Sequence, residues 1–159
     1  MQKVVPCLWF NGDAEDAAQF YVSLLPNSSI DRVLKSPTDT PSGPADTVLT
    51  VEFTLAGAKY MGLNGGPQYP FTEAVSFQIY CDDQAEVDRL WAALADGGSE
   101  VACGWIKDRW GLSWQIVPTR LIELLNDSDR ERARRAQEAM MQMVKIDIAE
   151  VERAVDEQN

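Results

Sequence analysis

The stretch VVPCLWFNGD, residues 4–13, and the stretch AVSFQIYCDD, residues 74–83, together decide the fold. Each begins as a short apolar run that is typical of a β-strand, and each ends at an aspartate that is followed by a helical pattern. Asp13 and Asp83 stand 70 residues apart, and a pattern that recurs at a fixed spacing predicts a repeated structural unit. We therefore predict two copies of one unit.

The first copy extends from the first stretch. Asp13 is expected to cap a helix over residues 14–25, where apolar side chains follow the helical period, and Pro26-Asn27 ends it. A polar loop rich in proline and glycine, residues 36–44, separates two of the strands that follow. The three predicted strands cover residues 29–34, 47–55 and 59–63.

The second copy has the same order of elements. Asp83 begins a helix whose apolar face carries Leu90 and Trp91, and Gly97-Gly98 ends it as a glycine C-cap would. Strands are expected around residues 100–103, 105–107 and 112–117. The prediction is an α+β fold of two βαβββ modules, module one at about 3–66 and module two at about 73–118.

A third region, residues 119–157, is predicted to be a C-terminal helical extension. One helix is expected directly after Pro118, a second begins at a capping box of Ser128 with Glu131, and a third begins at Asp147 with Glu150. Their apolar stripes, which include several methionines, are typical of core packing or of a dimer contact.

Composition limits the classes of function. The formal net charge is −11 and no basic patch offsets it, so we expect no nucleic-acid partner. The apolar runs are shorter than the roughly 20 residues of a membrane helix, and residues 1–6 lead directly into a strand, so neither a membrane span nor a leader is expected. The three cysteines are odd in number and far apart, which favours free thiols and a cytoplasmic location.

The chain contains no histidine, which removes the commonest general base and the commonest transition-metal ligand. Chemistry in this chain would have to use carboxylates, amides, hydroxyls, thiols, Lys or Arg. Glu52, Glu73 and Asp108 are candidate general bases if burial raises their pKa. Cys103, beside Gly104, is expected to be a small packed residue rather than a nucleophile.

Short motifs along nearly the whole chain resemble one known family, the PhnB-like branch of the vicinal oxygen chelate superfamily, which includes glyoxalase, bleomycin-resistance and dioxygenase proteins. This branch is often labelled 3-demethylubiquinone-9 3-methyltransferase-like. The motifs are Pro6-Cys7-Leu8-Trp9-Phe10, residues 17–21, residues 55–67, Ser76-Phe77-Gln78, Cys103-Gly104-Trp105 with Lys107-Asp108, Gly111 with Ser113-Trp114-Gln115, and Lys145-Ile146-Asp147. The resemblance implies a single glyoxalase-like domain, residues 1–159, whose modules form a curved mixed sheet around a cleft.

The resemblance also identifies where such proteins hold a metal ion, namely on the first and last strand of each module. The corresponding positions here carry Pro6, Met61 or Gly62, Ser76 and Gln115. Hard divalent ions require several carboxylates, and nickel, zinc or iron would require imidazole or thiolate as well. We therefore expect no metal and no other cofactor.

The methyltransferase label can be tested against the sequence. A typical enzyme that uses S-adenosylmethionine has a glycine-rich turn after its first strand, so that the backbone approaches the cofactor. Here that strand ends in residues 10–13, Phe-Asn-Gly-Asp, without such a run.

A neutral, aromatic-lined ligand site is the alternative that the residues favour. Strand alternation places Ser76 with Gln78 on one face and Ser113 with Gln115 on one face, although these groups could equally satisfy one another. The segment 64–69 could approach a ligand through its glycines or be a linker only. The predicted ligand-binding residues are Trp9, Asn64, Ser76, Gln78, Trp105, Ser113 and Gln115.

The leading hypothesis is a protein that binds or sequesters a small organic molecule. The alternatives are a glyoxalase-superfamily enzyme such as a lyase, isomerase or dioxygenase, a methyltransferase-like activity, and a purely structural dimer. We expect a homodimer, because the implied fold exposes a sheet edge or a cleft that a second copy covers.

Overall fold

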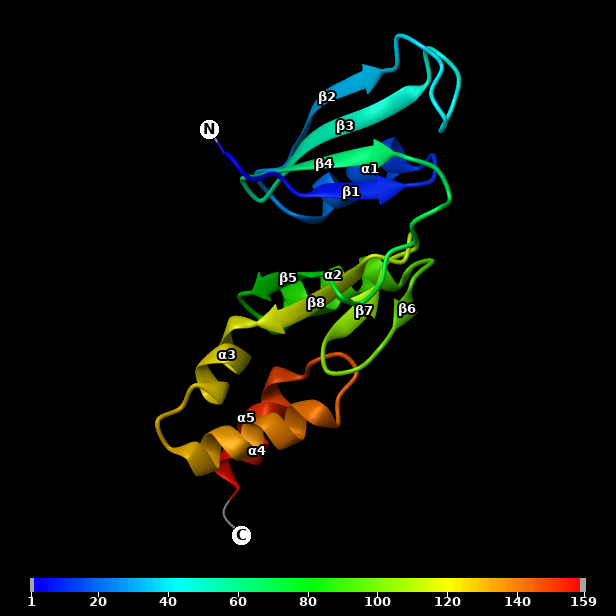
Figure 1. Ribbon diagram of the computed structural model, residues 1–159. Coiled ribbons are helices and arrows are strands. Elements are labelled where there is room, and N and C mark those ends of the chain that lie inside the picture. The colour runs from blue at the N-terminus through cyan, green and yellow to red at the C-terminus, as the bar shows by residue number, and fades with distance from the viewer. Residues whose placement is uncertain (1, 158–159) are drawn as a thin grey trace. The chain divides into compact units, whose positions relative to one another are not determined.

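The predicted repeat is present as two separate β-sheets in the computed structural model, which describes residues 2–157 (Figure 1). The chain divides into two units, Met1–Phe71 and Thr72–Asn159, which we call unit 1 and unit 2. Each unit combines a four-stranded mixed sheet with α-helical structure, so the α+β class is confirmed. The cleft implied by the resemblance stays a prediction.

Unit 1 has the predicted βαβββ order. Strands β1 and β4 run parallel, β3 pairs antiparallel with β4 and with β2, and the sheet order is β1-β4-β3-β2. The elements are β1 (Cys7–Phe10), α1 (Ala14–Leu24), β2 (Ser29–Lys35), β3 (Val48–Leu55) and β4 (Ala58–Asn64).

One face of this sheet packs against α1, and within residues 2–71 no helix covers the other face, which we call the open face. Val51, Phe53 and Leu55 alternate along β3 and are buried, as the period of two along a strand requires. A Cβ atom at Gly62 of β4 would lie 3.2 Å from the Cβ of Ala14, so the glycine permits the close approach of α1. The core of unit 1 is the layer between helix and sheet.

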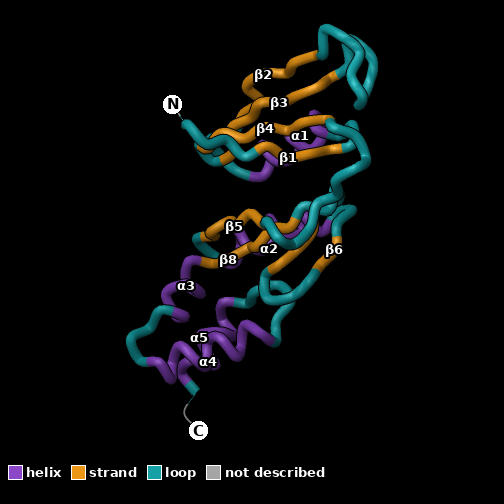
Figure 2. The backbone as a smooth tube through the Cα atoms, in the orientation of Figure 1, coloured by secondary structure: helices purple, strands orange, loops and turns teal. Residues whose placement is uncertain are grey.

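Unit 2 repeats the arrangement, with sheet order β5-β8-β7-β6 and β5 parallel to β8. Figure 2 shows its strands in orange. The elements are β5 (Ser76–Cys81), α2 (Gln84–Ala95), β6 (Ser99–Glu100), β7 (Trp105–Lys107) and β8 (Ser113–Pro118). Helix α2 covers one face, where Leu90 and Leu94 bury against the sheet side chains Ile106, Trp114 and Ile116.

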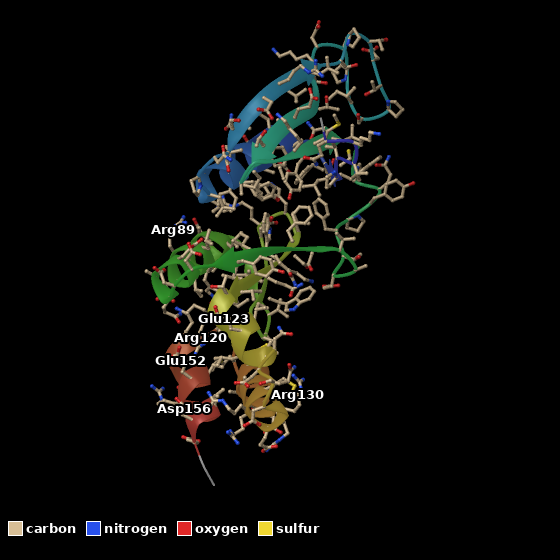
Figure 3. The ribbon with its side chains drawn as sticks, turned by 90° about the vertical axis from the view of Figure 1, so that its left-hand side faces the viewer. Arg89, Arg120, Glu123, Arg130, Glu152 and Asp156 are labelled. Atoms are coloured by element: carbon tan, nitrogen blue, oxygen red, sulfur yellow. The ribbon has the colours of Figure 1, made fainter. Side chains whose placement is uncertain are left out.

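The helical extension is confirmed and belongs to unit 2. It consists of α3 (Thr119–Leu125), α4 (Arg130–Met141) and α5 (Ile148–Asp156). Arg120 of α3 forms an ion pair with Glu152 of α5, with Nε and Oε1 3.0 Å apart. Figure 3 labels both residues. The buried cluster that joins these helices to β8 consists of Val117, Leu121, Leu124, Ala136, Ile146, Val151 and Val155.

Backbone and side-chain hydrogen bonds fasten the loop between α4 and α5 to the turn between β6 and β7 and to α2. The amides of Cys103 and Gly104 donate to the carbonyls of Met143 and Val144, both at 2.8 Å. The Gln84 side chain donates to the carbonyl of Ile146 at 3.0 Å and accepts from the amide of Ile148 at 2.9 Å. No helix of residues 2–157 is both long and apolar enough to cross a bilayer.

Three local predictions need correction. Asp13 stands at the N-cap position of α1 but its side chain makes no capping hydrogen bond. Helix α4 is capped by Asp129, not by Ser128, since the Asp129 carboxylate accepts from the amides of Glu131 and Arg132.

The third correction concerns the strand expected over residues 100–103, which is only the two-residue β6. The amide of Trp105 donates to the carbonyl of Ala102 at 2.9 Å, and Cys103 has a φ of 57°. A tight turn therefore occupies the residues that were expected to be extended.

Candidate ligand-binding site

A chain of polar side chains crosses the face of the unit 2 sheet opposite α2. The parallel register pairs Ser76 with Ser113 and Gln78 with Gln115, so these residues and Tyr80 point to the same face. The Tyr80 hydroxyl donates to Gln78 Oε1 at 2.7 Å, Gln78 Nε2 donates to Gln115 Oε1 at 3.1 Å, and Gln115 Nε2 donates to Ser76 Oγ at 2.8 Å. We call these four hydrogen-bonded residues the polar row.

The polar row partly satisfies itself, as one reading of the sequence allowed. Each glutamine amide nevertheless carries two N–H donors, and the row uses one from Gln78 and one from Gln115. Gln78 and Tyr80 are exposed, while Ser76 and Gln115 are half-buried. The row is therefore oriented by its own hydrogen bonds and keeps donor capacity for another molecule.

Ser113 lies next to the row and differs from it. Its side chain is 1% exposed, and its hydroxyl has no hydrogen-bond partner among residues 2–157. A buried hydroxyl without a partner costs about 1–3 kcal/mol relative to a satisfied one. Such a group is a candidate contact for a ligand atom.

Strand β7 borders this face with one aromatic and one basic residue. Trp105 pairs in register with Gln115, and Lys107 pairs with Ser113. The Lys107 ammonium forms an ion pair with Glu73, and this contact lowers the pKa of the Glu73 carboxyl. Glu73 is thus held as a carboxylate, which makes it a weaker base than an isolated glutamate.

The two predicted residues of unit 1, Trp9 and Asn64, form hydrogen bonds within that unit. The Trp9 indole donates to the carbonyl of Gly66 at 2.9 Å and packs edge-on against Tyr69, with ring centroids 4.9 Å apart. The amides of Gly65 and Gly66 both donate to the carbonyl of Phe10. The glycine segment therefore serves as packing for Trp9, and its amides are engaged.

Asn64 is buried and holds two backbone groups. Its Oδ1 accepts from the amide of Ala14 at 2.9 Å, and its Nδ2 donates to the carbonyl of Val48 at 3.0 Å. The side chain caps α1 in place of Asp13. Because both ends of the amide are occupied, we do not include Asn64 in the proposed site.

The donor set on the open faces does not fit a metal ion. Of the positions expected to hold a metal, Pro6 accepts through its carbonyl from the amide of Met61, and Ser76 accepts from the Gln115 side chain. Residues 2–157 contain no group of three His, Cys, Asp or Glu side chains placed to hold a cation. Met61 pairs in register with Glu52, but the Glu52 carboxylate forms an ion pair with Arg32. These side chains are therefore poor ligands for a divalent ion.

The remaining candidate bases are engaged. Asp108 is buried, as a base would need to be, but its Oδ1 accepts from the amides of Trp110 and Leu112 and its Oδ2 accepts from the Trp114 indole at 2.9 Å. Such a carboxylate organises its loop. Cys103 is half-buried in a turn.

Two residues of this face were not predicted. Tyr80 follows Gln78 by two positions, so the same strand alternation that selected Gln78 could have selected it. Lys107 comes from the short β7, whose register with β8 is not visible in the sequence.

Comparison with known proteins agrees with this architecture. A family model described as 3-demethylubiquinone-9 3-methyltransferase matches residues 2–117. A putative 3-demethylubiquinone-9 3-methyltransferase, PhnB protein, from Bacillus cereus is 31% identical, with 74% of this chain and 99% of that chain covered and a TM-score of 0.67. A Pseudomonas aeruginosa protein is 26% identical, with 74% and 98% covered and a TM-score of 0.61.

A glyoxalase/bleomycin resistance protein from Albidiferax ferrireducens is a more distant match at 14% identity, with 70% and 93% covered and a TM-score of 0.46. No protein of curated function matches the chain. The family match ends at residue 117, so the helices α3 to α5 lie outside it.

Proposed function

This chain belongs to the 3-demethylubiquinone-9 3-methyltransferase family, and from that premise we propose that it binds a small, partly polar organic molecule on the open face of the unit 2 sheet. The observation that carries the proposal is the polar row beside the buried, unpartnered hydroxyl of Ser113. Small-molecule sites typically combine apolar walls with a few oriented polar groups.

The chemistry of the row defines the class of ligand. Amide and hydroxyl groups both donate and accept, so they suit carbonyl and hydroxyl oxygens better than a full charge. The Trp105 indole offers an apolar surface beside Gln115. The basic group on this face, Lys107, is neutralised by Glu73. We infer an uncharged ring or chain that carries oxygen atoms along one edge.

Binding without conversion is favoured over catalysis. A base needs a carboxylate or amine free to take a proton, whereas Asp108 has three N–H donors on it and Glu73 is ion-paired. Polarisation of a substrate by a metal ion would need ligands other than the serine and glutamine found here.

The methyltransferase activity in the family description is the second candidate. Strand β1 is followed by Asn11-Gly12-Asp13, where Gly12 alone supplies positive φ, so the turn lacks the glycines that admit a nucleotide cofactor closely. Saturable binding of S-adenosylmethionine in calorimetry would favour this candidate over simple ligand binding.

The proposed site can be tested with a panel of neutral phenols, quinones and cyclic ketones, read by amide chemical shifts. We expect at least one class to bind with a Kd of about 1 mM or tighter, and Gln115→Leu to weaken that binding at least about tenfold. Gln19→Leu is the matched control, because it makes the same change on an exposed position of α1. Binding that is equal in the two variants, or absent from the whole panel, would contradict the proposal.

We also propose that the chain forms a homodimer. Among residues 2–157, the sheet of each unit ends in strands that pair on one side only, β1 and β2 in unit 1 and β5 and β6 in unit 2. Such edges are commonly covered by a second copy. Sedimentation equilibrium at micromolar concentration checks this, and a monomer there would contradict it.

A further inference from the structure

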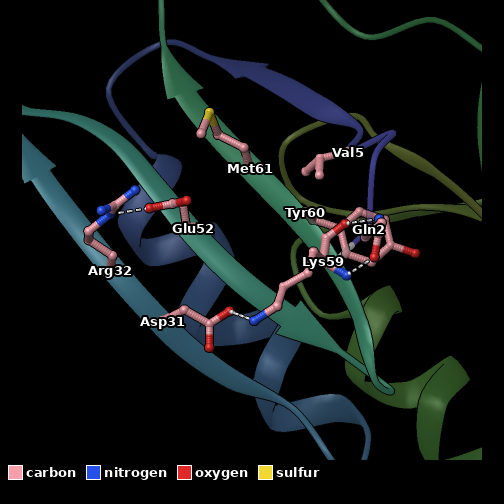
Figure 4. A pocket seen from close by; sticks show the side chains of 8 residues that line it. All are labelled: Gln2, Val5, Asp31, Arg32, Glu52, Lys59, Tyr60 and Met61. Carbon is pink, nitrogen blue, oxygen red and sulfur yellow. Dashed lines mark hydrogen bonds and ion pairs between the residues drawn. The ribbon is translucent and has the colours of Figure 1, made fainter.

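A pocket lies on the face of the unit 1 sheet opposite α1 and shares no residue with the polar row. Its volume is about 540 Å³, which is within the usual range for small-molecule sites. Figure 4 shows side chains from three strands and from the N-terminal segment around it. The lining residues are Gln2, Val5, Asp31, Arg32, Glu52, Lys59, Tyr60 and Met61.

The wall formed by the N-terminal segment is fastened to the sheet. Gln2 Nε2 donates to the carbonyl of Lys59 at 3.0 Å, and the amide of Lys59 donates to Gln2 Oε1 at 2.9 Å. These two bonds hold Gln2 at the beginning of β4, and Val5 follows it in the chain before β1. The pocket is therefore bounded on this side by hydrogen-bonded structure.

The charges of the pocket balance. Asp31 and Arg32 are neighbours on β2, and Figure 4 shows them turned toward Lys59 of β4 and Glu52 of β3 respectively. Residues 1–71 contain four basic side chains, Lys3, Arg32, Lys35 and Lys59, and two of the four line this pocket. In a chain of net charge −11, this pocket is neutral with both signs present.

Both ion pairs can be exchanged for ligand charges at small cost. The side chains of Arg32 and Glu52 are 73% and 33% exposed, and those of Lys59 and Asp31 are 54% and 29% exposed. Pairs this exposed contribute little to stability, because water screens both charges. The Thr54 hydroxyl and the Lys59 ammonium lower the pKa of Asp31, and Glu52 raises the pKa of Arg32, so both signs persist at neutral pH.

From this arrangement we propose that unit 1 binds a small zwitterion of the amino-acid or dipeptide class. The ligand carboxylate would contact Arg32 and Lys59, its ammonium would contact Asp31 and Glu52, and an aliphatic side chain would lie on Val5 and Met61. A ligand with a single sign meets two like charges among the four, which disfavours it. The neutral ligand proposed for unit 2 carries no charge that these four side chains could bind.

Titration calorimetry at pH 7 with L-leucine and glycyl-L-leucine tests this inference. We expect at least one of the two to bind with a Kd of about 1 mM or tighter. N-acetyl-L-leucine lacks the ammonium and L-leucinamide lacks the carboxylate, so each should bind at least about tenfold more weakly. No heat from either zwitterion up to about 10 mM, or equal binding of the N-acetyl compound, would overturn the proposal.

Variants locate the site. Arg32→Met and Lys59→Met should each weaken binding of the zwitterion at least about tenfold, while Lys35→Met, a matched change at the end of β2 outside the pocket, should leave it within about twofold. Thermal melting confirms that each variant is folded. Retained binding in both Arg32→Met and Lys59→Met would place the zwitterion elsewhere. Gln115→Leu should not affect this binding, so failure at one site is distinguishable from failure at the other.

Discussion

Asp108 shows how a buried carboxylate can serve the fold instead of chemistry. Its two oxygens accept from the amides of Trp110 and Leu112 and from the Trp114 indole, at 2.9, 3.1 and 2.9 Å. Trp114 is itself almost completely buried on the α2 side of the sheet. The carboxylate thereby ties the loop before β8 to the core of unit 2.

We predict that Asp108→Asn destabilises the protein by about 1–3 kcal/mol. Asparagine replaces one acceptor oxygen with an amino group, so at least one of the three N–H donors loses its partner. Urea unfolding measures the change, and Asp96→Asn, at an exposed site after α2, is the control. Unfolding midpoints that are the same for both variants would show that the three hydrogen bonds contribute little.

Cys81 is the thiol most affected by its surroundings. It is fully buried on β5, and burial raises its pKa from 9.0 to about 12. At pH 8 this lowers the thiolate fraction about a thousandfold, and the thiolate is the reactive form. Because the folded pKa is above that of the unfolded chain, the stabilisation by the neutral thiol is complete below pH 9 and is lost as the pH rises toward 12.

Iodoacetamide labelling of the native protein at pH 8, followed by mass spectrometry, checks this. Cys7, which is exposed on β1, should be modified first, and Cys81 only after unfolding in urea. Modification of Cys81 at the rate of Cys7 in the native protein would show that this part of unit 2 opens readily.

Residues of the candidate site differ in how well the sequence identified them. Ser76, Gln78, Ser113 and Gln115 share one face because alternation along two strands is a local property, and their side-by-side placement is confirmed. Strand alternation could not reveal that Asn64 caps α1. Its partner at the start of α1 is 50 residues away, and the sequence gives no sign of that contact.

Helix α2 begins with a complete N-terminal cap. Asp83 Oδ1 accepts from the amide of Glu86 at 2.9 Å, and the Glu86 carboxylate accepts from the amide of Asp82 at 3.1 Å. Asp13 holds the equivalent place before α1, where Asn64 supplies the acceptor instead. Asp13 and Asp83 are equivalent positions of the sequence repeat, but the two helices are therefore capped by different side chains.

We predict that Asp83→Ala lowers the free energy of unfolding by about 1 kcal/mol, since it removes an N-cap hydrogen bond. Asp13→Ala should cost distinctly less, because its side chain makes no such bond. Chemical denaturation of the two variants in parallel gives the comparison. An equal loss in both would indicate that charge at the helix N-terminus matters more than the hydrogen bond.

The order of elements could be predicted because hydrophobic periodicity is strong in both modules, and all of the predicted helices are present. The details that failed depend on backbone geometry. The cap of α4 is one residue later than predicted, since Ser128 and Asp129 are both good caps and only the entry of the chain selects between them. The strand at 100–103 failed because the chain turns at Cys103 to meet the loop after α4.

At the scale of the whole molecule, the donor sets of both sheets predict independence from metal ions. Protein purified without chelator should contain no stoichiometric metal, and a panel of divalent ions should leave the melting temperature unchanged, since a ligand stabilises only the state that binds it. Atomic emission spectrometry measures the metal content, and a thermal shift assay measures the melting temperature. One bound ion per chain would instead point to metal-assisted catalysis by ligands outside the expected positions.

The family match ends at residue 117, so the helical extension is an addition to unit 2 beyond the matched residues. Ile146 is central to this addition. Its side chain is buried in the cluster that joins α3, α4 and α5 to β8, and its carbonyl accepts from Gln84 of α2. A Cβ atom at Gly104 would lie 3.2 Å from the Ile146 side chain, so the extension packs closely on the β6–β7 turn.

We predict that Ile146→Ala costs about 2–5 kcal/mol, as truncation of a buried aliphatic side chain usually does. If the extension is part of the core of unit 2, hydrogen exchange followed by mass spectrometry should accelerate in α3 to α5 and also in β5 and β8. Peptides from unit 1 should be unchanged, because that unit has its own helix and sheet core. Met141→Ala, at an exposed position of α4, is the matched control and should alter neither region. Acceleration confined to the three helices would show that they fold as an appendage, in which case the sheet of unit 2 does not depend on them for stability.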